Sequence, residues 1–150
     1  MGMNISVAGD FGEVKQALRR LLSKEKCEIA SSFIDTCDIL VAHGAGNSYN
    51  ANPRAVVVNS DDKSALGSAV NAEMMVTYGF NSRACVTASS VTDDCMQVCV
   101  QRSLPCINGG VLEQQEFSLP LVNGEDPETA LAAVTAALVS GLLPNDISKQ

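Results

Sequence analysis

Short apolar runs alternate with a helical pattern along the first half of the chain. Runs typical of buried strands occupy residues 5–8, 27–30, 39–42, 56–59 and 74–78. Between the first two runs, residues 13–22 carry apolar side chains at helical spacing. The run at 56–59 is apolar almost throughout, as in a strand that is covered on both faces. Strands that alternate with helices in this way predict a mostly parallel sheet.

The pattern changes from residue 84 onward. Polar and apolar residues alternate at 97–101 and 115–119, which is typical of antiparallel strands with one solvated face. We therefore expect strands over 84–91, 96–102 and 114–121, with a turn at 105–110. These strands should extend the parallel sheet or pack beside it.

A last helix is predicted at 128–140, where Ala and Leu dominate. Asp126 is the expected N-cap and Pro127 the first helical residue, and Gly141 should end the helix. An earlier helix is expected over 61–71, capped by Ser60 or Asp61, and residues 144–150 are expected to form a tail.

These elements predict a three-layer α/β fold over residues 1–150, which we take as one domain. Hydrophobic residues make up 46% of the chain but aromatic residues only 4%, so the core must consist mainly of aliphatic side chains. Val57 in the middle of its strand and Leu131 on the last helix should both be buried.

Charge and cysteine content narrow the possible partners. The net charge of -7 argues against a nucleic-acid backbone, and no apolar run reaches membrane-spanning length. No signal peptide is evident, so we expect a cytoplasmic protein.

The six cysteines form no Cys-x-x-Cys pair and only one His is present, so a zinc site of standard spacing is not expected. Four of the cysteines lie among apolar residues and are interpreted as small core side chains: Cys27, Cys37, Cys85 and Cys99.

A glycine-containing loop joins the first strand to the first helix. Gly9, Asp10, Phe11 and Gly12 stand where α/β proteins often bind phosphate, because backbone N–H groups of a helix N-terminus point at the anion. A phosphate-binding P-loop, however, has a lysine and a hydroxyl directly after its second glycine. Glu13 and Val14 occupy these places. The loop is therefore interpreted as a structural turn that acidic residues stabilise at the helix N-terminus.

A family resemblance emerges at residues 56–62, Val-Val-Val-Asn-Ser-Asp-Asp, followed by Val-Thr-Tyr-Gly-Phe at 76–80. Together with Leu-Pro-Leu-Val-Asn-Gly at 119–124 and the Ala-rich helix after it, these stretches resemble the central domain of Mur ligases. Mur ligases are ATP-dependent amide ligases of peptidoglycan synthesis. The resemblance implies their fold over residues 54–147 and extends loosely to residue 5.

The same resemblance shows which catalytic groups are replaced. The family's phosphate lysine and magnesium hydroxyl correspond to Glu13 and Val14, and its adenine-binding His and Asn have no counterpart at 124–129. We also expect the family's flanking domains to be absent. We therefore expect a non-catalytic binding or regulatory module without a cofactor or metal, linked to cell-wall or amide-ligase metabolism. The alternative is a ligase component or nucleotide binder that another chain completes, with ATP and Mg²⁺ as its cofactors.

Four further residues are candidates for a binding site, each with a structural alternative. His43 follows a strand at the edge where open α/β sheets bind ligands, but it equally suits an ordinary loop. Asp61 and Asp62 could hold a metal or a ribose, although helix capping also explains them, and Asn59 ends the preceding strand. The partner is expected to be a small molecule or a protein, with a homo-oligomer as a further possibility.

Overall fold

The computed structural model describes residues 3–8, 12–25, 27–30, 37–42, 53–61, 72–122 and 124–148. Five strands come from the first half of the chain: β1 (Met3–Ala8), β2 (Cys27–Ala30), β3 (Ile39–Ala42), β4 (Ala55–Asn59) and β5 (Met74–Tyr78). Three longer strands follow: β6 (Val86–Val91), β7 (Cys95–Val100) and β10 (Gln115–Pro120). All of these strands were predicted, with boundaries that agree to within two residues.

These eight strands form one mixed sheet in the order β10-β7-β6-β5-β4-β3-β1-β2. The pairs from β2 to β5 are parallel, and β6 joins them through the parallel pair Tyr78↔Val86. β7 and β10 are antiparallel and extend the sheet. The mostly parallel α/β sheet with additional antiparallel strands is thus confirmed.

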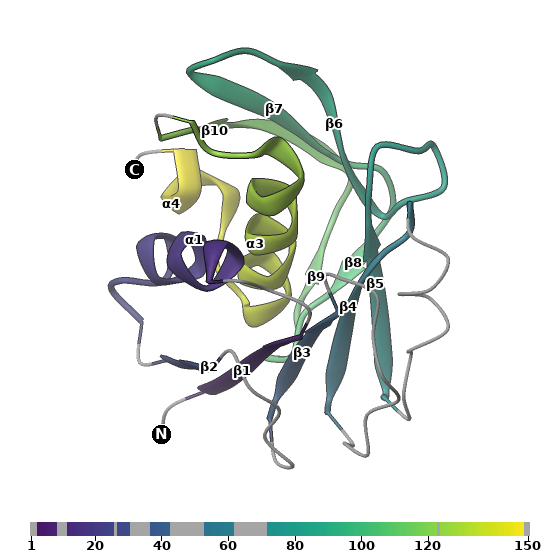
Figure 1. Cartoon of the computed structure of the whole chain (residues 1–150). Coiled ribbons are helices and arrows are strands. Elements are labelled where there is room, and N and C mark those ends of the chain that lie inside the picture. Colours follow the sequence, from purple (N-terminus) through teal and green to yellow (C-terminus); the bar gives the residue numbers. More distant parts are fainter. Residues whose placement is uncertain are drawn as a thin grey trace.

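The helices α1 (Glu13–Leu21), α3 (Pro127–Ser140) and α4 (Pro144–Ser148) lie together on one side of the sheet (Figure 1). α3 packs against α1 and against the central strands, and α4 packs against β10. Every residue of α3 from Thr129 to Val139 is buried, as expected for a helix that is apolar around its whole circumference. Leu131 and Val57 are both fully buried, as predicted.

β4 lies in the middle of the sheet and is covered on both faces. Its residues Val56 and Val58 belong to one apolar cluster together with Cys37 and Leu40. Val57 faces the opposite way, into the large core that α1 and α3 cover. The helix predicted at 61–71 falls, apart from Asp61, outside the described residues, so the third layer stays a prediction.

Three expectations need correction. Residues 144–148 are helical and not a tail, because α4 docks on β10 with the Ser148 hydroxyl donating to the Ser118 carbonyl oxygen at 3.0 Å. The turn predicted at 105–110 is confirmed over 106–110, but Pro105 belongs to a small unpredicted ladder of β8 (Leu104–Pro105) and β9 (Val111–Leu112). Cys27 and Cys99 are only half-buried, because Cys27 lies on the edge strand β2 and Cys99 on the polar face of β7; Cys37 and Cys85 are buried.

None of the helices in the described part of the chain is long and apolar enough to cross a membrane.

Candidate functional site at the carboxyl edge of the sheet

The N-termini of α1 and α3 meet beside the carboxyl edge of the parallel strands. α1 begins after Gly12, whose φ of 100° is readily adopted only by glycine. Glu13, the first helical residue, is exposed, and its Oε2 accepts from the Thr129 hydroxyl at 3.4 Å. Thr129 belongs to the first turn of α3 and is buried. The Glu13 carboxylate therefore sits at the helix end that would otherwise attract a phosphate.

The N-terminus of α3 is satisfied by its own acidic residue. Asp126 is the N-cap, as predicted, and its Oδ2 accepts from the backbone N–H of Thr129 at 3.1 Å. The same oxygen is 3.2 Å from the Thr129 hydroxyl. Pro127 has no N–H to satisfy, and the Asp126 side chain engages the Thr129 N–H in the first turn of α3.

Asn59 connects the end of β4 to α3. Its side chain Nδ2 donates to Glu128 Oε1 at 2.8 Å, and its Oδ1 accepts from the backbone N–H of Asp61 at 2.9 Å. Asn59 is nearly fully buried, so both bonds replace contacts with water. The side chain thus holds the strand end against the helix.

Asp61 fastens the loop that follows β5. Its Oδ2 accepts from the backbone N–H of Phe80 at 2.7 Å, and its Oδ1 accepts from the Asn81 side chain at 2.7 Å. Gly79 makes this close approach possible, because a Cβ there would lie 2.8 Å from Asp61 Oδ2 and from Ser60 Oγ. The carboxylate is therefore engaged in joining two strand ends.

A cavity of about 430 Å³ opens at this edge between α1 and the segment that leads into α3. Glu13, Glu125 and Asp126 line it, and Arg20 is its only basic lining residue among those that the structure describes. Arg20 is already paired: its guanidinium donates two bonds to Glu125, at 2.7 and 3.0 Å. The remaining charge of the cavity is negative, which disfavours a phosphate group.

Val14 is fully buried and contributes to the main hydrophobic core. Its side chain therefore points away from the cavity in which the resemblance would place the magnesium hydroxyl. A hydroxyl at this position would enter the core beside apolar groups, at an energetic cost.

Five of the six cysteines are poorly suited to nucleophilic chemistry. Burial raises the pKa of the Cys27 thiol to about 11, with further contributions from the negative charges of Asp38, Glu25 and Glu28. Burial also raises the pKa of Cys37, Cys85, Cys99 and Cys106. A raised pKa keeps a thiol in its protonated, unreactive form at neutral pH. Within the described ranges, no group of three or more His, Cys, Asp or Glu side chains could hold a metal ion.

The structure places the predicted site residues as follows. Gly12, Glu13, Asn59 and Asp61 all lie at the carboxyl edge, but Asn59 and Asp61 bond to Glu128 and to the loop after β5 and do not converge on one cavity with Glu13. Gly9, Asp10, His43 and Asp62 fall outside the described residues. Sequence reasoning missed Thr129 and the Arg20–Glu125 pair, because each contact joins segments more than a hundred residues apart.

The fold is that of Mur ligases. MurF from Acinetobacter baumannii matches 99% of this chain with a TM-score of 0.63 and 11% sequence identity. A second structure, of the UDP-N-acetylmuramoylalanyl-D-glutamyl-2,6-diaminopimelate--D-alanyl-D-alanyl ligase of the same organism, matches 98% of the chain with a TM-score of 0.64 and 14% identity. The chain spans 44% and 45% of these two proteins, less than half of their length. No protein-family model and no curated protein matches the sequence. The predicted Mur-ligase-like fold is thereby confirmed.

Proposed function

We propose that the chain is a non-catalytic binding or regulatory module with the Mur ligase fold, linked to cell-wall or amide-ligase metabolism. The observation that carries the proposal is the placement of Glu13. Its carboxylate stands at the N-terminus of α1, bonds to Thr129 and lines a cavity that Glu125 and Asp126 also line. A triphosphate at this point would meet carboxylates instead of a lysine.

The alternative is a ligase component or nucleotide binder that another chain completes. The shared fold supports it, because the two MurF structures match almost the whole chain. A partner could supply the missing cation to the acidic cavity. The two functions differ in whether this chain alone has any affinity for ATP.

Isothermal titration of the purified protein with ATP and Mg²⁺ separates them. We expect no binding by the wild type. A dissociation constant near or below about 1 mM would overturn the proposal and favour the nucleotide binder.

A charge reversal tests the role of Glu13 directly. Glu13→Lys should produce weak, measurable triphosphate binding, because a cation then stands at the helix N-terminus. Glu73→Lys is the matched control: Glu73 is exposed, lies at the opposite end of β5 from Gly79, and its substitution changes the net charge equally. If both variants bound alike, the gain would come from net charge, and the assignment of Glu13 to the degenerate phosphate position would be wrong.

A further inference from the structure

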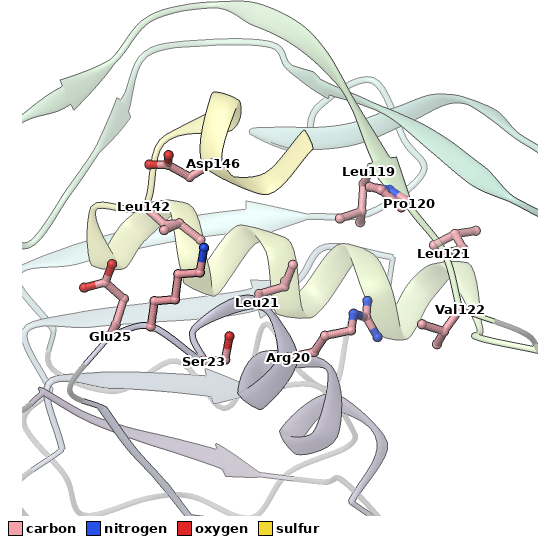
Figure 2. A pocket seen from close by; sticks show the side chains of 11 residues that line it. Arg20, Leu21, Ser23, Glu25, Leu119, Pro120, Leu121, Val122, Leu142 and Asp146 are labelled. Carbon is pink, nitrogen blue, oxygen red and sulfur yellow. The ribbon is translucent and has the colours of Figure 1, made fainter. Parts of the chain in front are cut away.

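A second and larger cavity, of about 550 Å³, opens where three chain segments end side by side (Figure 2). The end of α1 supplies Arg20 and Leu21, β10 and the residues after it supply Leu119 to Val122, and the link from α3 to α4 supplies Leu142. The volume is typical of small-molecule sites, which occupy about 300–1,000 Å³. It shares Arg20 and Val122 with the cavity at the carboxyl edge of the sheet.

Local chain geometry keeps the cavity open. α3 ends at Gly141, whose φ of 110° turns the chain so that the Leu142 N–H bonds back to the Ala137 carbonyl at 3.1 Å. Leu121 continues the line of β10, with its N–H donating to Asp94 O at 2.8 Å. The Arg20–Glu125 ion pair fixes the end of α1 against the segment before α3. All three walls are therefore tied to the body of the fold.

The cavity has an apolar part and a charged part. Leu21 and Leu119 are buried, and Pro120, Leu121 and Leu142 are half-buried. Figure 2 shows the residues from Leu119 to Val122 on one side, and Glu25 and Asp146 on the other, on either side of Leu142. Lys24 adjoins Glu25 in the chain and also lines the cavity. Arg20, which pairs with Glu125, lies on the side of Val122, whereas Glu25 and Asp146 lie at the other end of the cavity.

The charges at this end are available to a ligand. The side chains of Lys24, Glu25 and Asp146 are exposed, and within the described part of the chain no hydrogen bond or ion pair engages them. They present one positive and two negative groups. A purely anionic head would be repelled by Glu25 and Asp146, and a purely cationic head by Lys24. A ligand group that carries both an ammonium and a carboxylate can pair with both the negative and the positive side chains.

We propose that this cavity binds a free α-amino acid with a large apolar side chain. The α-carboxylate pairs with Lys24 and the α-ammonium with Glu25 and Asp146, while the side chain lies against Leu119, Leu121 and Leu142. The inference goes beyond the proposed function, since it holds whether or not nucleotide binds at the carboxyl edge.

A set of ligands that differ only in charge tests the proposal. NMR titration of the labelled wild-type protein with L-phenylalanine, up to about 10 mM, should give saturable shifts confined to the cavity residues. Phenylalaninamide lacks the carboxylate and N-acetylphenylalanine lacks the ammonium, so each should bind about threefold to fivefold more weakly. Alanine, which has no large apolar side chain, should not bind in this range.

Two variants separate recognition of the α-carboxylate from recognition of the α-ammonium. Lys24→Met should weaken phenylalanine about threefold but should not weaken phenylalaninamide, whose ammonium is then no longer repelled. Asp146→Asn should weaken phenylalanine and phenylalaninamide alike but should not weaken N-acetylphenylalanine, whose carboxylate is then less repelled. Arg19→Met is the matched control, because Arg19 is an exposed cation on α1, five residues before Lys24, and does not line the cavity.

Three results would overturn the inference: no saturable shift with phenylalanine, equal binding of the three charged forms, or an effect of Arg19→Met as large as that of Lys24→Met. None of them bears on the ATP titration, so the failure of one proposal can be told from the failure of the other.

Discussion

The Arg20–Glu125 pair joins α1 to the segment before α3 and separates the two cavities, since Arg20 lines both of them. Arg20→Met removes the cation and keeps most of the side-chain length. It leaves the Glu125 carboxylate, whose side chain is only 7% exposed, without its two guanidinium donors. The Arg20 side chain is 30% exposed, so the site lies between a surface pair and a buried one.

The magnitude follows from these exposures. Exposed pairs contribute about 0.2–1 kcal/mol, whereas stranding one member of a buried pair costs about 3–5 kcal/mol. We therefore expect Arg20→Met to lower the free energy of unfolding by about 2 kcal/mol. Glu125→Met should cost about 1 kcal/mol, because Arg20 can turn towards water. The double variant should lose about 2 kcal/mol instead of the sum of about 3, which gives a coupling of about 1 kcal/mol.

Urea unfolding followed by circular dichroism measures all four proteins of this cycle. For a domain of this size, about 2 kcal/mol corresponds to a fall in the thermal midpoint of about 4–8 °C. Arg19→Met, on the same helix but exposed, should change stability by less than about 0.5 kcal/mol. Additivity of the two single losses to within about 0.5 kcal/mol would refute the reasoning, because the two side chains would then act independently.

Two further outcomes are expected. Leu131→Ala should lower the free energy of unfolding by about 2–5 kcal/mol, since Leu131 is fully buried in α3. Leu143→Ala, at a residue that is 59% exposed, should be nearly neutral in thermal unfolding. Equal effects of the two substitutions would place Leu131 on the surface. Iodoacetamide at pH 8 should alkylate Cys27 about tenfold more slowly in the folded than in the urea-unfolded chain, because folding raises the pKa of Cys27 from 9.0 to about 11. Mass spectrometry follows the alkylation, and equal rates in the two states would contradict the shift. As the folded pKa is the higher one, the stability that Cys27 contributes is complete below about pH 9 and is lost as the pH rises through about 11.

The type and order of most elements in the described part of the chain were determined by the sequence alone, because the signals involved are local. Apolar spacing predicts α1, and alternation predicts β7 and β10. Asp126, Pro127 and Gly141 mark the ends of α3 through capping chemistry that involves only nearby backbone groups. That Glu13 stands where the Mur ligase resemblance would place a phosphate-binding lysine is likewise an interpretation from the sequence, and it stays a prediction.

The tertiary structure decided what these residues touch. The contact of Glu13 with Thr129, the pairing of Arg20 with Glu125 and the bond from Phe80 to Asp61 depend on which strands and helices lie side by side. Local sequence does not encode that order, because the same strand pattern fits many sheet topologies. α4 was missed for the same reason: five residues carry too little periodicity, and its helix is held by docking on β10.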